Sequence, residues 1–326
     1  MAGLRQIFAL FIPVLFLFLL TSFALQAEEK TGLLHDSIIV QKQKRTFDYY
    51  VPTSYSHDQS VPLVLAFHGR GSTAENQIKL TKFDELAEKE RFIAVFPNSV
   101  AVHEPNLKKG HERQWNDGRM DTPAFRAGID DVQFISQVID YFTEHYNIDE
   151  SRVYAAGMSN GAFFANRLAI ELSDRIAGVG AVAGTLAVPI ANQKPREPVS
   201  IVLIMGTDDP IVPYEGVNGY AFSAEETIDY WKKANGLNSN PSIKKLPKKD
   251  KKDTTEVIKI AFSDPTNRAE VILYKIQGGG HAWPGGPQYA KTNKIGLTSR
   301  QIHATEVIWN ELKKHKKSKP ISIFSR

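Results

Sequence analysis

The sequence predicts an α/β protein in which helices cover both faces of a mostly parallel sheet. Short runs that are apolar throughout alternate with longer stretches whose apolar residues recur every three or four positions. No fixed period repeats along the chain. A composition of 42% hydrophobic and 23% charged residues is typical of a globular protein. These observations exclude a fibrous or a disordered chain.

The expected strands are the short apolar runs. Residues 37–51 are predicted to form two strands joined by a polar turn. Further strands are expected at residues 62–67, 92–96, 152–158, 177–183, 199–205 and 271–276. A strand that is apolar on both faces is typical of the buried centre of a parallel sheet. A basic stretch at residues 244–253 lies between two weak strands.

The expected helices lie between these strands. Their ranges are 74–90, 130–146, 161–172 and 299–315, with one more beginning at Ser223. Glu226 follows Ser223 by three positions and predicts a capping box. Residues 98–127 are expected to be irregular. Because no linker interrupts the alternation, we expect one domain over residues 28–315, followed by a basic tail over residues 316–326.

Residues 1–27 are typical of an export signal. One positive charge, Arg5, precedes an unbroken apolar run at residues 7–20, and small residues follow at Ala24 and Ala27. The run is shorter than the roughly 20 residues of a membrane span. We expect cleavage after Ala27 or Ala24, no stable membrane span afterwards, and a secreted or periplasmic protein. An uncleaved anchor is the alternative.

The composition excludes several kinds of chemistry. The chain has no cysteine, which rules out disulfides, cysteine nucleophiles and thiolate-bound metals. Its net charge of +4 is too small for a surface that tracks nucleic acid. No group of His, Asp and Glu has metal-ligand spacing, so we expect no metal site. The stretches 244–253 and 313–319 are expected to be solvated. The oligomeric state is left open.

Gly157-Met158-Ser159-Asn160-Gly161 follows an expected strand directly and precedes an expected helix. This is the context of a nucleophile elbow, in which a strained turn lifts a serine hydroxyl clear of the sheet. The glycines remove side chains that would clash there. Ser159 is therefore the candidate nucleophile.

A serine nucleophile needs a base and a carboxylate that orients the base. His281 follows the last expected strand after three glycines, where this architecture places the base. Asp208 and Asp209 both follow the expected strand 199–205. We favour Asp209, because Pro210 restricts it to an extended backbone, with Asp208 as the alternative. The order Ser159, Asp209, His281 is that of α/β hydrolases.

The oxyanion of an acyl-transfer transition state needs hydrogen-bond donors. One is the backbone N–H of Asn160, which follows the nucleophile. The second is expected from the loop HGRGS after strand 62–67, at the N–H of Arg70. His68 in the same loop is expected to pin the loop rather than act as a base.

The motifs HGRGS, GMSNG, GTDDPIVPY and GGGHAWPGG together resemble those of secreted esterases of the polyhydroxybutyrate depolymerase and feruloyl-esterase-like family. The resemblance runs from about residue 46 to residue 312. It implies an α/β-hydrolase fold without a large lid, ester hydrolysis without a cofactor, and the triad and oxyanion residues named above. It also implies that Trp115 and Trp283 bind substrate, with packing as the alternative. Many relatives carry cysteines near Trp115, and some have HGC where this chain has His68-Gly69-Arg70.

The resemblance implies a small-molecule or polymeric ester as substrate. Hydroxyalkanoate oligomers or similar short-chain esters are the first expectation. Feruloyl or acetyl groups on plant polysaccharide are the alternative. A serine peptidase on the same fold, or an exported binding protein with an inactive triad, are the remaining alternatives.

Overall fold

The computed structural model describes residues 30–265 and 267–318. The expected export signal, residues 1–27, lies outside the described residues, as does the expected tail from residue 319 onward. Within these two described ranges, no helix is long and apolar enough to cross a membrane.

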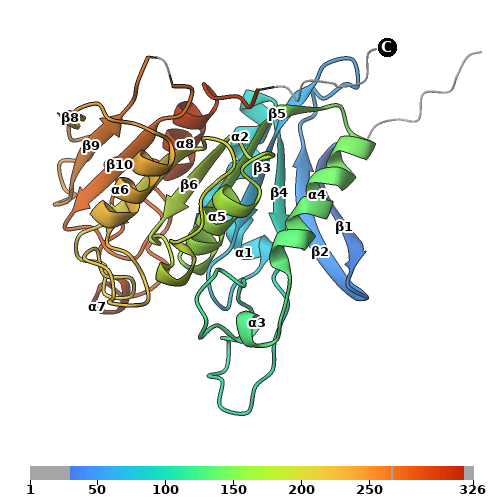
Figure 1. The fold of residues 1–326 in the computed structure, drawn as a ribbon, viewed down its shortest axis with the longest axis horizontal. Helices are drawn as coiled ribbons and strands as arrows, with labels where there is room; N and C mark the ends of the chain where they lie inside the picture. The colour runs from blue at the N-terminus through green and yellow to red at the C-terminus, as the bar shows by residue number, and fades with distance from the viewer. Residues whose placement is uncertain (1–29, 266, 319–326) are drawn as a thin grey trace, which may run out of the picture.

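A ten-stranded sheet forms the centre of the molecule (Figure 1). In order across the sheet, the strands are β1 (Gly32–Val40), β2 (Gln43–Val51), β4 (Ile93–Pro97), β3 (Val61–Phe67), β5 (Ile148–Met158), β6 (Gly178–Val182), β7 (Ser200–Gly206), β10 (Val271–Gln277), β9 (Glu256–Phe262) and β8 (Ser242–Lys245). Neighbours from β4 to β10 in this order pair in parallel. The two strands at each edge pair antiparallel. The expected α/β class with a mostly parallel sheet is confirmed.

Helices cover both faces of the sheet. One face carries α4 (Asp131–His145), α5 (Asn160–Glu171) and α6 (Ala224–Ala234). The opposite face carries α1 (Ala74–Thr81), α2 (Phe83–Glu90) and α8 (Ala304–Leu312). Figure 1 shows α4, α5 and α6 in front of the strands. The remaining helices are short: α3 (Pro123–Arg126), α7 (Thr292–Ile295) and the 3-10 turn η1 (Val188–Ile190).

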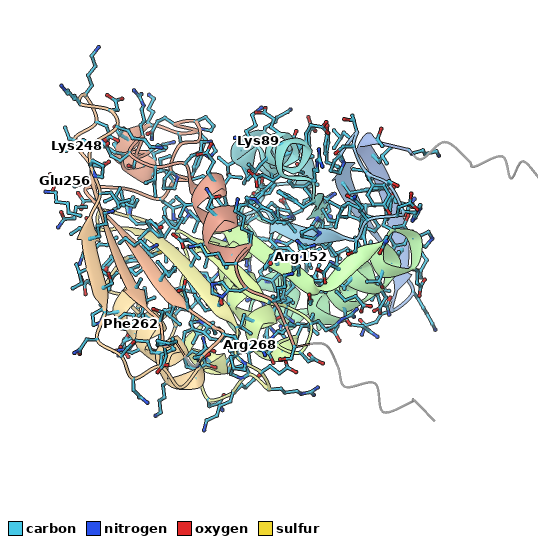
Figure 2. The ribbon with its side chains drawn as sticks, turned by 90° about the horizontal axis from the view of Figure 1, so that it is seen from above. Lys89, Arg152, Lys248, Glu256, Phe262 and Arg268 are labelled. Carbon is cyan, nitrogen blue, oxygen red and sulfur yellow. The ribbon has the colours of Figure 1, made fainter. Side chains whose placement is uncertain are left out.

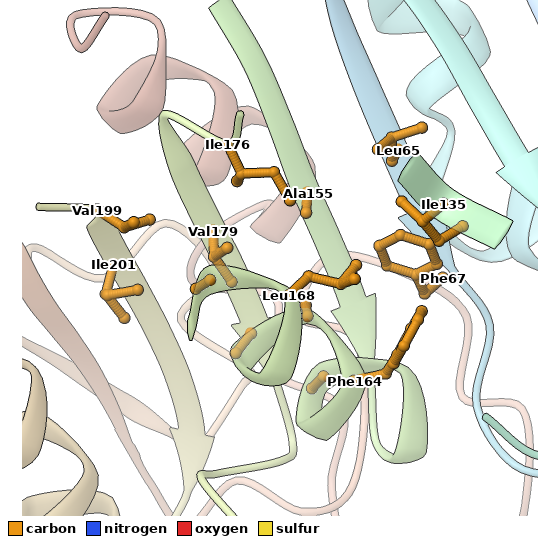
Figure 3. Packing of buried hydrophobic residues seen from close by; sticks show 14 of the residues in the cluster. Leu65, Phe67, Ile135, Ala155, Phe164, Leu168, Ile176, Val179, Val199 and Ile201 are labelled. Carbon is orange, nitrogen blue, oxygen red and sulfur yellow. The ribbon is translucent and has the colours of Figure 1, made fainter. Parts of the chain in front are cut away.

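The apolar side chains of the strands pack in two separate hydrophobic cores, one on each face of the sheet. Along β3, Leu65 and Phe67 face the α5 side, whereas Val64 and Ala66 face the α8 side. Figure 3 shows the first core, where Phe164 of α5 packs edge-on against Phe67, with ring centroids 5.2 Å apart. Burial on both faces explains why these strands are apolar throughout.

Two expected helices have different bounds in the structure. The single helix predicted over 74–90 is interrupted at Lys82, which adopts a left-handed backbone (φ 57°, ψ 33°) and separates α1 from α2. The interruption lets Phe83 pack against Phe92 and Trp283. The helix predicted over 299–315 spans only α8, because the backbone of His303 is still extended. The capping box at Ser223 is confirmed.

The two basic stretches have different environments. Most of residues 244–253 are exposed beside the edge strands, where Figure 2 labels Lys248 near Glu256. The second stretch, expected to be solvated, is instead partly docked. Lys313 pairs with Glu90 (3.1 Å), and Lys317 is buried with its ammonium donating to the Pro198 carbonyl (2.8 Å). Lys313 and Lys317 are therefore held by hydrogen-bond acceptors from distant parts of the chain, which the sequence pattern does not predict.

Candidate active site

The parallel register brings four loops to one edge of the sheet. Phe67 at the end of β3 pairs with Gly157 near the end of β5, and Gly206 at the end of β7 pairs with Ile276 near the end of β10. The loops that follow these strands carry Arg70, Ser159, Asp209 and His281. Residues far apart in the chain therefore meet at the carboxyl ends of the strands.

Ser159 occupies a strained turn between β5 and α5. Its backbone has φ 56° and ψ −123°, and its N–H donates to the Val182 carbonyl (2.9 Å). A non-glycine residue with such a φ is a conformational outlier, and outliers of this kind cluster at functional sites. The turn places Ser159 on the wall of the pocket described below.

The flanking glycines are required by close backbone contacts. A Cβ on Gly157 would lie 2.2 Å from the Gly161 carbonyl oxygen. A Cβ on Gly161 would lie 2.5 Å from the carbonyl oxygen of Phe67. The turn is therefore pressed against the end of β3, where the loop bearing Arg70 begins.

Asp209 and His281 form a buried pair. The imidazole Nδ1–H donates to Asp209 Oδ2 at 2.8 Å, and both side chains are at most 4% exposed. The other carboxylate oxygen accepts the backbone N–H groups of Ile211 and Val212, each at 2.8 Å. Asp208, the alternative, is exposed and accepts the Thr207 hydroxyl. The structure thus places Asp209, and not Asp208, against the imidazole.

The loop that carries His281 is held by backbone contacts. The His281 N–H donates to Ile295 (2.6 Å), and the Asp208 N–H donates to Gly279 (2.9 Å). A Cβ on Gly280 would lie 2.1 Å from the Ile295 carbonyl oxygen. Gly280 is therefore required because the backbone at Ile295 passes too close to leave room for a side chain.

The loop after β3 passes close to the Ser159 turn, since a Cβ on Gly69 would lie 3.5 Å from Ser159 Cβ. Asn160 is the first residue of α5, and the N–H groups of a first helical turn lack acceptors within the helix. In the loop after β3, the N–H groups of Gly71 and Ser72 donate to Arg113 and Gly69. The Arg70 N–H has no acceptor among the described residues.

His68 is buried and pins this loop. Its Nδ1–H donates to the Gly69 carbonyl (2.7 Å), and its Nε2 accepts the Ser99 N–H (3.1 Å). Burial lowers the pKa of this imidazole to about 4, so the ring is neutral. The expected structural role of His68 is confirmed, because both ring nitrogens are occupied.

The Trp115 segment is tied to the site by hydrogen bonds. The Trp115 N–H donates to Asn160 Oδ1 (2.7 Å), and its indole N–H donates to the His68 carbonyl (3.0 Å). The next N–H, of Asn116, donates to buried Asp131 (2.7 Å), which also pairs with Arg45 (2.6 Å). These bonds hold the loop in a chain without cysteine.

The structure corrects the expectation that Trp115 and Trp283 contact substrate. Both indoles are completely buried, and neither lines the pocket. Trp115 stacks on Phe164, with ring centroids 4.9 Å apart, and the Trp283 indole N–H donates to Thr305 (3.0 Å). Both indoles are packed beneath the loops that form the site, so Trp115 and Trp283 position these loops and do not contact a ligand in the pocket.

A pocket of about 870 Å³ opens beside Ser159 and His281. Its wall includes two polar residues that sequence reasoning missed, Arg119 and Gln77. Arg119 comes directly after Trp115-Asn116-Asp117-Gly118, and Gln77 is one of the buried residues of α1. A polar residue on the buried face of a helix is a signal that could have singled out Gln77.

A serine on a strained strand-to-helix turn, sharing a pocket with a buried histidine–carboxylate pair on a parallel sheet, defines the class of α/β hydrolases. The chain belongs to the phospholipase/carboxylesterase family, which matches residues 52–238. It is a serine ester hydrolase. The matched span contains Ser159 and Asp209 and ends before His281.

Several curated relatives are esterases by name. The chain is 26% identical over 284 residues to a putative esterase, NocK, of Nocardia uniformis subsp. tsuyamanensis, which covers 82% of this chain and 79% of that protein. It is 28% identical over 245 residues to feruloyl esterase B of Piromyces equi, covering 71% of this chain and 41% of the relative. It is also 28% identical over 125 residues to poly(3-hydroxyalkanoate) depolymerase C of Paucimonas lemoignei, covering 38% of this chain and 28% of the relative. The chain thus matches less than half the length of the last two.

Solved structures share the fold. An acetyl xylan esterase from Aspergillus awamori superposes with a TM-score of 0.53 at 14% identity, over 76% of this chain and 94% of that one. A ferulic acid esterase from Anaeromyces mucronatus superposes with a TM-score of 0.50 at 17% identity, over 79% and 87%. The expected fold without a large lid and the resemblance to an esterase family are both confirmed.

Proposed function

We propose that the protein cleaves carboxylic esters through an acyl-enzyme formed on Ser159. His281 is the general base, and Asp209 holds its tautomer and stabilises the imidazolium. The observation that carries this proposal is the buried Asp209–His281 hydrogen bond of 2.8 Å beside the strained turn of Ser159. The backbone N–H groups of Arg70 and Asn160 stabilise the oxyanion.

The reaction has two halves. The Ser159 hydroxyl attacks the ester carbonyl as His281 Nε2 takes its proton, and the alcohol leaves with that proton. A water molecule, activated by His281, then attacks the acyl group, and the proton returns to Ser159 as the acid is released. Asp209 keeps its position through both halves, because its two oxygens accept one imidazole N–H and two backbone N–H groups.

Ser159→Ala tests this proposal. We expect hydrolysis of p-nitrophenyl butyrate to fall by about 10³-fold or more. Ser72→Ala is the matched control, since Ser72 lines the same pocket without standing on the turn. Its turnover should change little. Wild-type turnover in Ser159→Ala would overturn the proposal.

For the substrate, we propose hydroxyalkanoate oligomers or similar short-chain esters. A wide pocket and the absence of a lid among the described elements support entry of an oligomer end. Feruloyl or acetyl groups on polysaccharide are the second candidate, favoured by the resemblance to feruloyl esterase B. Rates on 3-hydroxybutyrate oligomers and on methyl ferulate discriminate the two, and faster ferulate cleavage would favour the second.

A serine peptidase and a non-catalytic binding protein are weaker candidates. Labelling of Ser159 by a fluorophosphonate excludes the non-catalytic protein, since an inactive serine does not react. Cleavage of the p-nitrophenyl ester without cleavage of the matching p-nitroanilide excludes the peptidase.

We also propose that residues 1–27 direct export and are removed, and that residues 28–315 form the catalytic domain. The order of charge, apolar run and small residues in the sequence supports this proposal. Amino-terminal sequencing of the protein from the cell exterior or periplasm should find a start at residue 28 or 25. An intact Met1 on exported protein would contradict it.

A further inference from the structure

The pocket wall is positively charged. Arg70, Lys79 and Arg119 line it, and among the described residues no aspartate or glutamate does. Arg70 and Lys79 are exposed, and Lys79 pairs with exposed Glu75 (2.6 Å). Exposed charges of this kind attract an ion weakly, because water and salt screen them. Arg119 differs from them in being buried.

The guanidinium of Arg119 is held in a fixed position. Its Nε donates to Asp117 at 3.0 Å, and Nη2 donates to the same carboxylate. Its Cζ lies 4.0 Å from the centroid of the Phe163 ring and 4.9 Å from that of Tyr220. Arg119 is only 4% exposed. A buried arginine held on three sides is already ordered before a ligand arrives.

One edge of this guanidinium has no partner. The Nη1 group has no acceptor among the described residues and is not one of the fully enclosed unpaired atoms. Since Arg119 lines the pocket, that edge is available to a ligand. Asp117, by contrast, is fully buried, does not line the pocket, and also accepts the amide of Asn160.

We infer that Arg119 binds an acid group of the substrate, so that the preferred ester carries a carboxylate near the scissile bond. This inference rests on the proposed function at Ser159. Arginine donates strong, charge-assisted hydrogen bonds to carboxylates, and these bonds strengthen where water is excluded. The Arg119 guanidinium lies over the ring of Phe163, which closes the first turn of α5 by donating its N–H to the carbonyl of the N-cap Ser159 (3.1 Å). Arg119, Phe163 and Ser159 all line the same pocket, so one ligand can contact both the guanidinium and the serine.

Gln77 adds nothing to this inference. Both polar atoms of its amide are buried and lack a partner among the described residues, so a ligand in the pocket does not reach them. A hydroxy-acid oligomer offers a terminal carboxylate to Arg119.

The test compares ester pairs that differ only in charge. One pair places the charge in the acyl part: mono-p-nitrophenyl succinate against its methyl ester. The other places it in the alcohol part: 4-acetoxybenzoate against methyl 4-acetoxybenzoate. We expect wild type to prefer the anion in one pair by roughly 10- to 100-fold in kcat/KM. The pair that shows the preference identifies the side of the scissile bond.

The variant that removes the cation is Asp117→Asn with Arg119→Gln, which avoids leaving a buried carboxylate unpaired. We expect the preference for the anion to fall to within about threefold, while the neutral esters are still cleaved. Arg196→Gln, an exposed arginine 78% accessible and outside the pocket, is the charge-matched control and should keep the preference.

The outcomes are distinguishable. Ser159-dependent cleavage of the neutral esters without any preference for the anions, in either pair, would overturn this inference and leave the proposed function intact. Failure to cleave any ester would overturn both. If the double variant does not fold, the wild-type comparison alone decides. A preference that survives in a folded double variant also overturns the role of Arg119.

Discussion

The Asp209 carboxylate divides its two oxygens between His281 and the backbone. Oδ2 accepts the imidazole Nδ1–H at 2.8 Å, while Oδ1 accepts two N–H groups of the following turn. Because both side chains are buried, the carboxylate cannot turn away from the imidazole without leaving hydrogen bonds unmade. This geometry fixes the tautomer with the Nε2 lone pair free to accept a proton.

Asp209→Asn should therefore lower kcat by about 10³- to 10⁴-fold, because an amide nitrogen facing Nδ1 favours the wrong tautomer. The measurement is steady-state hydrolysis of p-nitrophenyl butyrate. Asp208→Asn is the matched control, one position earlier and exposed, and should stay near wild type. A large loss in Asp208→Asn with none in Asp209→Asn would reverse the assignment.

Gly161→Ala should destabilise the fold by more than about 3 kcal/mol, because its Cβ would overlap backbone atoms that cannot move aside. Urea unfolding measures the effect. Gly219→Ala is the control: Gly219 has a left-handed backbone (φ 69°) with nothing within 4 Å of a Cβ. It should lose only about 1–2 kcal/mol. Equal losses of unfolding free energy in the two variants would contradict this expectation, because they would show that the backbone around Gly161 shifts to accommodate a Cβ.

His68 should make stability depend on pH. Its pKa falls from 6.5 to about 4 on burial, so the unfolded chain takes up the proton first as the pH falls. The stabilisation from the neutral ring is complete above about pH 6.5 and is lost toward pH 4. Between pH 7 and 4.5 wild type should lose about 2 kcal/mol more than His68→Asn. Urea unfolding at both pH values tests this, with His103→Asn, an exposed histidine, as control. Parallel curves for wild type and His68→Asn would contradict the expectation.

Lys82→Gly should stabilise the protein by roughly 0.5–1 kcal/mol, since glycine relieves the left-handed backbone between α1 and α2 at a smaller entropic cost. Lys89→Gly, inside α2, is the matched control and should destabilise by about 1 kcal/mol. Thermal unfolding measures both. Destabilisation by Lys82→Gly would show that the Lys82 side chain contributes more than its backbone costs.

Much of the fold could be predicted because local sequence and packing agree. The strands β3, β4 and β7 are apolar on both faces since both cores press on them, and that burial is visible as an unbroken apolar run. The break at Lys82 could not be predicted, because helix propensity and the apolar stripe both continue through it. What decides the break is the packing of Phe83 against Trp283, a residue about two hundred positions away.

By itself, the sequence determined the α/β class, the turn at Ser159 and the strand ends that carry Asp209 and His281, because these depend on local patterns of glycine, polar residues and apolar runs. Only the tertiary structure decided that Asp209 rather than Asp208 meets the imidazole, that Trp115 and Trp283 pack instead of lining the pocket, and that the pocket wall carries Arg119 and Gln77. Those outcomes depend on which side chains point into the site where segments distant in sequence come together. Short-range sequence patterns do not determine that orientation.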